Sequence, residues 1–440
     1  GPIRLLPTSS QKRVYCALLS ITMVVTMDEA SHSVLPTDNE EFIIEGQAAV
    51  QLKFVHSEVE MSSVKGYHPE FVHQHFGDKE TIFGYKNLEI TLYYTDASMY
   101  IYPEIKYDKE ISSVSKELKA DDVMKLLKDQ LPSSQIDMMV STMDNFRRLL
   151  KEQDSFKPFG ELLSKFDYDG REMQVLKVTE GSPQFDAYLA RVQTIALWYI
   201  DAAQYTDNDD PRWVHYLVYE ATKRTDGEGI RYALAGYASV VNFYCYPEML
   251  RPRIAHILLL PQYRRAGNGA KFLQAIYNDL VPRRNVRDIT AEDPGESFIH
   301  LRDFVDCCNC TKLPEFSVAN LSKGFTAEMK DAALTKLKIN PRQARRVYEI
   351  LRLMSTNTAD EKEMRAYRID VKRRLEAPLK KSDRDWRKLR RALDEKEMTS
   401  VAASQMNIDK KMNLLQQMFD EEIADYKITI NRLKLFSGLF

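Results

Sequence analysis

The segment RPRIAHILLLPQYRRAGNGAKFLQAIYNDL, residues 251–280, decides the fold that we predict for this chain. Its apolar run over residues 254–260 predicts a strand, and the amphipathic pattern that begins near Ala270 predicts a helix. Gly267 and Gly269 fall in the turn between them, where a missing Cβ lets the backbone approach a ligand closely. The predicted order is therefore strand, glycine-bearing loop, helix.

This loop is a candidate anion site. A helix that begins near Ala270 would point unpaired N–H groups and the positive end of its dipole at whatever lies in the loop. Arg264 and Arg265 could add positive charge, although each is equally well explained as a solvated surface arginine. The dinucleotide fingerprint GxGxxG is absent, and two glycines alone could simply form a strand-to-helix turn.

The part of the chain before this segment shows two kinds of pattern. Residues 40–106 alternate loosely between apolar and polar positions, which predicts strands and turns. Residues 120–153 have helical spacing, interrupted by a turn at Pro132. We predict a small mixed N-terminal domain over residues 40–155.

The central segment, residues 156–320, contains the quoted loop and alternates between strand and helix patterns. An amphipathic helix is expected near residues 189–203, and strands are expected at residues 215–220 and 234–244. This alternation predicts an α/β domain.

From residue 321 to residue 440 the strand signals disappear and helical spacing continues to the end, which predicts an all-helical C-terminal domain. The apolar positions that carry this spacing are Val347, Ile350, Leu351 and Met354, and later Met412, Leu415, Phe419 and Ile423. The fold class we predict is thus mixed, α+β or α/β, with a helical C-terminal third.

Composition sets further limits. Among 440 residues, 62 are basic and 64 acidic, so attraction to a nucleic acid or a basic peptide must come from local patches. The five cysteines, Cys16, Cys245, Cys307, Cys308 and Cys310, form no regular disulfide framework and fit a reducing compartment. Since a second cysteine pair at zinc-finger spacing is missing, we predict no metal site there and read the last three thiols as part of a helix end.

The first residues allow two interpretations. Basic residues precede an apolar run over residues 14–27 that resembles a secretory signal, but this run is shorter than the roughly 20 residues that span a bilayer. Export would lead to an oxidising compartment, so we expect residues 1–39 to be a poorly ordered extension instead.

Candidate catalytic carboxylates lie in VRDITAEDPGESFIHLRDFV, residues 286–305. A short strand is predicted to end at Glu292 and Asp293, and a helix follows. Asp293, Pro294 and Glu296 match the N-cap, N1 and N3 positions of a capping box, which would give Asp293 a structural role. Glu292 has no such role and lies at the carboxyl end of a strand, where open α/β folds bind ligands, although it could also be an exposed turn residue.

These segments resemble known enzymes. Arg264, Gly267 and Gly269 match the Q/R-x-x-G-x-G/A pattern of GNAT acetyltransferases. RPRIAHILLLP, GNGA, DITAEDP, LRDFV, ARRVYEILRL, FKPFG and HQHFGDKETIFGYK all resemble segments of the type B histone acetyltransferase catalytic subunit, across about residues 42–437.

The resemblance implies a donor site, a base and a direct transfer to lysine. It implies that Glu292 is the general base. A lysine amine has a pKa of about 10.4 and is protonated near neutral pH, so a base must remove a proton before the amine can attack a thioester. Asp293 would assist, as would Asp201, which has a shorter side chain than the glutamate that the family commonly has there. No cysteine nucleophile is needed. Acetyl-CoA would be held by Ile257, Leu258, Leu259, Arg264, Arg265, Ala266, Gly267, Asn268, Gly269 and Ala270.

The same resemblance implies two regions that contact a histone tail. The first is Asp78, Lys79 and Glu80, which the residues alone would describe as a polar turn. The second is Val241, Asn242 and Phe243, which the residues alone would describe as a core strand. Carboxylates can pair with a basic tail, and an aromatic strand can pack along an extended peptide.

The expected enzyme is a histone lysine acetyltransferase that acts on the tail of newly synthesised, free histone H4, in complex with H3, before chromatin assembly. A WD-repeat histone chaperone is the expected partner, in nucleus and cytoplasm, with no membrane and no sequence-specific nucleic acid involved. The basic residues at 372–391 could contact DNA or form a solvated helical face. Two alternatives remain open: a same-fold enzyme with another amine acceptor, and a histone-binding subunit with weakened catalysis.

Overall fold

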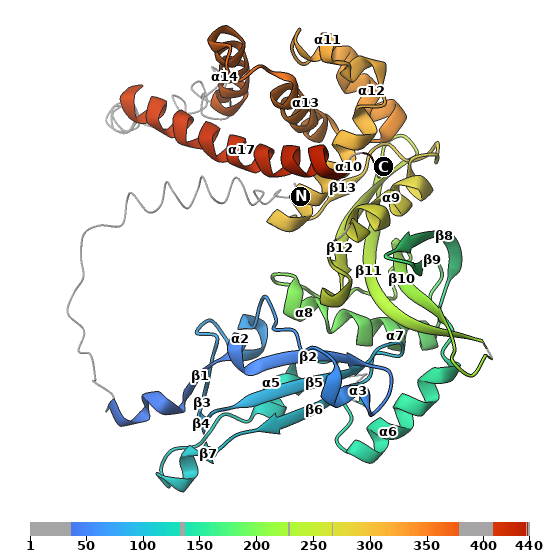
Figure 1. The fold of residues 1–440 in the computed structure, drawn as a ribbon, viewed down its shortest axis with the longest axis vertical. Coiled ribbons are helices and arrows are strands. Elements are labelled where there is room, and N and C mark those ends of the chain that lie inside the picture. The colour runs from blue at the N-terminus through green and yellow to red at the C-terminus, as the bar shows by residue number, and fades with distance from the viewer. Residues whose placement is uncertain are drawn as a thin grey trace. The chain divides into compact units, whose positions relative to one another are not determined.

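The chain forms two compact units in the computed structural model (Figure 1). The residues that the structure describes are 37–132, 137–227, 229–265, 267–377, 408–436 and 438. Within these ranges, unit 1 takes its residues from Gly1–Asp279 and Thr290–Gly295, and unit 2 takes its residues from Leu280–Ile289 and Glu296–Phe440. Most of the predicted extension, Ala266 and most of the basic stretch 372–391 lie outside the described residues.

The N-terminal part of unit 1 is built on a three-stranded sheet. Strand β5 (Glu89–Thr95) pairs in parallel with β2 (Val50–Val55) and antiparallel with β6 (Ile101–Lys106). Helix α6 (Met143–Glu152) begins at its N-cap Thr142, whose hydroxyl accepts a hydrogen bond from the backbone of Asn145. The apolar face of α6 contributes to a buried cluster of Val55, Met61, Tyr93, Phe146 and Leu150.

The remaining elements of this part are short. Strand pairs β1–β3 and β4–β7 form two small sheets. The elements are η1 (Thr37–Phe42), β1 (Ile43–Glu45), α2 (Gly46–Ala49), α3 (Glu60–Ser63), α4 (His73–Phe76), β3 (Thr81–Phe83), β4 (Tyr85–Lys86), β7 (Lys109–Glu110), η2 (Ile111–Ser113), α5 (Val123–Asp129) and η4 (Gln153–Ser155).

A six-stranded sheet is the centre of the rest of unit 1, with the strand order β13-β12-β11-β10-β9-β8. All its strand pairs are antiparallel except β12–β13, which is parallel. The central strands β10 and β11 have long buried runs, as their apolar sequences predict. The bounds are β8 (Glu161–Tyr168), β9 (Arg171–Val178), β10 (Trp213–Lys223), β11 (Ile230–Cys245), β12 (Met249–Leu259) and β13 (Thr290–Ala291).

The helix predicted over residues 189–203 is wrong in its bounds. Two helices occupy this region, α7 (Pro183–Gln193) and α8 (Ala196–Tyr199). Helix α7 begins earlier because Ser182 caps it and Pro183 occupies its first turn. It ends at Gln193, and the hydroxyl of the following Thr194 bonds back to the Arg191 carbonyl at 2.7 Å.

The strand–loop–helix prediction for residues 251–280 is confirmed (Figure 1). Strand β12 leads through a short 3-10 turn, η5 (Pro261–Tyr263), into helix α9 (Asn268–Leu280). The helix buries one apolar face that includes Phe272, Leu273 and Ile276.

Unit 2 is helical, as predicted for the end of the chain. Its described elements are α10 (Glu296–Cys310), η6 (Pro314–Phe316), α11 (Val318–Leu321), α12 (Ala327–Leu337), α13 (Pro341–Ser355), α14 (Glu361–Glu376) and α17 (Ile408–Phe436). Most of the apolar positions predicted from helical spacing are buried or half-buried. Met354 and Met412 are exposed instead, at 38% and 54%.

The predicted fold class, a mixed α/β protein with a helical C-terminal region, is confirmed. Within the described ranges, none of the helices combines the length and the apolar character needed to cross a membrane.

Candidate functional site

The loop between β12 and α9 is turned by two residues with positive φ. Arg265 has φ 76° and Gly267 has φ 85°. A Cβ built on Gly267 would meet no atom of the described residues within 4 Å, so the backbone there faces open space. An open loop at the start of a 13-residue helix fits an anionic ligand, because the helix dipole is positive at this end.

Asn268 holds the loop from inside. It is only 1% exposed, and its Nδ2 donates a hydrogen bond to the Tyr263 carbonyl at 2.9 Å. Ala270 is likewise buried, whereas Gly269 is partly accessible. The side chains of Asn268 and Ala270 therefore support the loop, and only their backbone atoms could contact a ligand.

The Arg264 side chain contacts other residues of the chain instead of pointing into solvent. Its Nε donates to the Leu259 carbonyl at 2.9 Å, its Nη1 pairs with the Glu70 carboxylate, and its guanidinium lies 4.7 Å from the Tyr199 ring centre. Glu70 is itself fixed, because its backbone N–H donates to the Trp198 carbonyl at 2.9 Å. Arg264 thus ties the loop to the end of β12, while Arg265 stays exposed.

The carboxyl end of β12 has one open edge. On one side, Ile257, Leu258 and Leu259 pair with β11. On the other side, β13 pairs only with Arg253 and Ile254, and no other described strand continues the sheet there. The register with β11 also shifts after Ile254, which indicates a bulge at the point where the β13 pairing ends.

Glu292 follows β13 directly and lies beside this edge. Its backbone N–H donates to the Ile254 carbonyl at 2.9 Å. Its side chain is 54% exposed, and its Oε1 lies 4.0 Å from Nη1 of Arg253. This position brings an accessible carboxylate next to the strand that carries Ile257–Leu259.

The capping box predicted for Asp293, Pro294 and Glu296 is wrong. Helix α10 begins only at Glu296, so Pro294 does not occupy its first turn. Asp293 has φ 37°, in the left-handed region, whereas an N-cap residue has extended backbone. A non-glycine residue with this backbone costs free energy and is found preferentially at functional sites.

The second predicted tail-contact region lies close to the same carboxylate. Val241 is buried and belongs to the core, whereas Phe243 is half-buried. The guanidinium groups of Arg253 and Arg212 lie 4.4 Å and 5.6 Å from the Phe243 ring centre. Arg253 therefore joins Phe243 to Glu292, and Asn242 donates its backbone N–H to the Arg212 carbonyl at 3.0 Å.

In the first predicted tail-contact region, Glu80 lies near His73, which also lies near Asp201. No role for this histidine was predicted from the sequence. His73 Nε2 lies 3.4 Å from Asp201 Oδ1, and its Nδ1 lies 3.9 Å from Glu80 Oε1. Asp201 is 70% exposed, and Asp78 and Lys79 are exposed as well. No local signal marks His73, because its partner Asp201 is far away along the chain.

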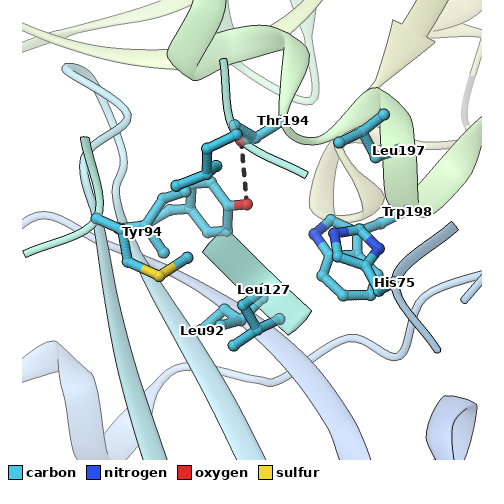
Figure 2. A pocket seen from close by; sticks show the side chains of 10 residues that line it. His75, Leu92, Tyr94, Leu127, Thr194, Leu197 and Trp198 are labelled. Atoms are coloured by element: carbon cyan, nitrogen blue, oxygen red, sulfur yellow. Dashed lines mark hydrogen bonds between the residues drawn. The ribbon is translucent and has the colours of Figure 1, made fainter. Parts of the chain in front are cut away.

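The helix that carries His73, α4, also carries His75, which lines a small apolar pocket. Figure 2 shows the His75 ring lying flat on Trp198, with ring centres 3.6 Å apart and planes 2° from parallel. Across the pocket, the hydroxyls of Tyr94 and Thr194 hydrogen-bond at 3.1 Å. Burial lowers the pKa of His75 to about 3, so this imidazole is neutral and serves packing.

The thiols are poor candidates for chemistry. Cys307, Cys308 and Cys310 lie in the last turn of α10, as predicted, and are buried. Burial raises the pKa of Cys308 to about 11 and those of the other two well above the usual value. Protonated thiols are weak nucleophiles, so these three side chains are better explained by packing.

Known proteins resemble this chain over most of its length. The family description "Histone acetyl transferase HAT1 N-terminus" matches residues 42–201, and "Histone acetyltransferase type B catalytic subunit, C-terminal" matches residues 302–353. The histone acetyltransferase type B catalytic subunits of Rattus norvegicus and Homo sapiens are each 36% identical to it over 400 residues, covering 89% of this chain and 94% of the relative. The protein of that name from Cryptococcus neoformans is 27% identical, covering 84% of this chain and 90% of its own length.

Proposed function

Because this chain belongs to the family of type B histone acetyltransferase catalytic subunits, and is thus a histone acetyltransferase, we propose that it acetylates lysines in the N-terminal tail of newly synthesised, free histone H4. The acetyl donor is acetyl-CoA. The observation that carries the proposal is the position of Glu292, an exposed carboxylate bonded through its backbone to the strand that leads into the glycine loop.

The donor substrate binds along the open edge of β12 and in the loop that follows. The pyrophosphate of acetyl-CoA suits the α9 N-terminus and the open space at Gly267, with Arg265 as the accessible cation. Backbone groups of Ile257–Leu259 face the thioester. Ala266, which belongs to the same loop, lies outside the described residues.

Glu292 is the general base. It takes a proton from the lysine ammonium, directly or through water, since only the neutral amine attacks the thioester. Asp293 and Asp201 are the proposed helpers. Arg253 lies where it can pair with Glu292 before the acceptor arrives, so an incoming lysine ammonium replaces one cation with another at this carboxylate.

The histone tail contacts two surfaces. Asp78 and Glu80 attract its basic side chains, with Lys79 beside them, and His73 links Glu80 to Asp201. Asn242 and Phe243, with the buried Val241 beneath them, form the second contact.

We further propose that the substrate is histone H4 in complex with H3, acetylated before chromatin assembly. A WD-repeat histone chaperone is the proposed partner, and nucleus and cytoplasm are the proposed compartments. Neither a membrane nor a specific DNA sequence has a part in this function.

The test is turnover of acetyl-CoA on a free H4 tail peptide, beside a peptide in which arginine replaces the tail lysines. We expect turnover only on the lysine peptide, because arginine keeps the charge and offers no amine that can be acetylated. Equal turnover on a polyamine or an unrelated lysine peptide would instead favour another amine acceptor.

The Glu292→Gln variant separates an enzyme from a histone-binding subunit. Turnover is expected to fall while peptide binding persists, and Glu180→Gln, an exposed glutamate after β9, is the matched control. Peptide binding without turnover in the unmodified chain, with acetyl-CoA bound, would favour the binding subunit.

A further inference from the structure

Three side chains of unit 2 converge at a place unrelated to acetyl transfer. Glu296 and His300 stand four residues apart on α10, a spacing that puts both on one face of the helix. Asp425 reaches them from α17, which packs against α10. One ligand atom from each of the three lies within 4.8 Å of those of the other two.

His300 is the unusual member of this group. The residue is only 5% exposed, and its Nε2 has no hydrogen-bond partner among the described residues. That nitrogen faces Asp425 Oδ1 at 3.6 Å, which is too long for a hydrogen bond. A buried ring nitrogen without a partner is uncommon in folded proteins, and here it points at a carboxylate without bonding to it.

The spacing fits two ligands of one ion. Ligands that bind zinc tetrahedrally at about 2.0–2.1 Å lie about 3.4 Å from each other, close to the 3.6 Å between His300 and Asp425. One imidazole and two carboxylates suit zinc better than magnesium or calcium, which prefer oxygen ligands alone. We propose that Glu296, His300 and Asp425 bind a divalent transition-metal cation, with zinc as the favoured ion.

The surroundings are compatible with a cation. Glu296 is exposed and the Asp425 side chain is 40% exposed, so an ion and a water ligand can enter from solvent. Arg346 lies 3.9 Å from the other Asp425 oxygen, Oδ2, and its charge is balanced by Asp303 at 2.7 Å and Glu422 at 3.2 Å. Arg346 can therefore act as an outer partner of the ligating carboxylate.

The metal would join the start of α10 to α17. A ligand that binds only the folded state stabilises it, so zinc is expected to raise the melting temperature of the protein. No local sequence pattern marks this site, because Asp425 lies far from the other two residues along the chain. The rival explanation is a simple polar contact between His300 and Asp425, which would bind no metal.

The experiment titrates zinc into the full-length, tag-free chain after EDTA treatment, by calorimetry, with melting curves recorded with and without zinc. The unmodified chain is expected to bind one zinc and to melt at a higher temperature in its presence. His300→Gln and Asp425→Asn are expected to bind at least about tenfold more weakly, since loss of an outer partner alone costs 10–100-fold.

Two further variants provide an exposed ligand substitution and a control outside the proposed site. Glu296→Gln removes an exposed ligand in the first turn of α10, so it should fold even if the buried His300→Gln does not, and it too should weaken zinc binding. Glu421→Gln, an exposed position on α17, should bind zinc like the unmodified chain. Absence of zinc binding in the unmodified chain, or equal affinity in all the variants, as binding at Cys245 would give, would overturn the proposal.

Discussion

Glu349 in unit 2 and Glu292 in unit 1 are the same residue type in opposite settings. Glu349 is 0% exposed, and its carboxylate accepts hydrogen bonds from Arg345 at 2.7 Å and from Arg374 at 2.8 Å. Glu292 is half-exposed, and an arginine Nη1 lies 4.0 Å from its carboxylate. A buried carboxylate held by two arginines serves the fold, whereas an accessible one at a strand end is open to a substrate, as the general-base role proposed for Glu292 requires.

The sharpest test of this contrast is Glu292→Gln. We expect turnover to fall by about 10²–10⁴-fold, the usual contribution of a general base. The free energy of unfolding should change by less than about 0.5 kcal/mol, because the side chain is exposed. Steady-state kinetics and chemical denaturation measure the two effects, and a turnover within a few-fold of Glu180→Gln would refute the assignment.

The Glu349→Gln variant tests the buried carboxylate of the comparison. Removing this buried charge leaves the half-buried Arg345 and Arg374 with less compensation, so we expect a loss of about 3–5 kcal/mol of stability. Urea unfolding followed by circular dichroism measures it. Glu421→Gln, exposed on α17, is the control and should stay within about 0.5 kcal/mol. A loss no larger than in that control would remove the structural side of the comparison.

The Gly267→Ala variant tests whether the backbone of the glycine loop holds the acetyl donor. Alanine at φ 85° costs about 1–2 kcal/mol, although its Cβ would meet no atom. If the strain is relieved by moving the loop, the KM for acetyl-CoA should rise by roughly tenfold while the KM for the peptide stays constant. Gly227→Ala, also at positive φ in an open turn, controls for strain outside the loop. Unchanged donor kinetics would mean that the loop does not hold the donor.

Glu70→Gln is expected to act more weakly. The pair between Glu70 and Arg264 is partly exposed, so its loss costs at most about 1 kcal/mol, which corresponds to about fivefold. Because Arg264 ties the loop to Leu259, the effect should fall on the KM for acetyl-CoA. An effect confined to the peptide KM would show that Glu70 serves the acceptor side instead.

The smallest effect concerns pH and a buried histidine. Burial alone would lower the pKa of His56, but the Asp96 carboxylate at 2.7 Å outweighs it and the pKa is raised. His56 therefore contributes stability that is fully present below its unfolded pKa of about 6.5 and is lost as pH rises through the folded pKa. The stability difference between the unmodified chain and His56→Gln should shrink over this range in denaturation curves. A constant difference would argue against a charged His56.

Local patterns predicted most of the elements but not all their limits. The β12–loop–α9 unit was predicted because glycines, an apolar run and helical spacing are all local signals. The capping box at Asp293 failed because the chain turns at a left-handed residue before α10 begins, and a three-residue motif does not specify that turn. His73 was missed because its partners Asp201 and Glu80 meet it only after folding.

By itself, the sequence determined the fold class, the glycine loop and the family, since periodicity, missing Cβ atoms and recurring segments are properties of the chain. Only the tertiary structure decided that Arg264 turns to Glu70 and Leu259, and that Arg253 lies between Glu292 and Phe243. It alone also brought Asp425 to His300. Interactions between charged side chains depend on distance in space, and residues remote along the chain acquire that distance only when the strands and helices pack.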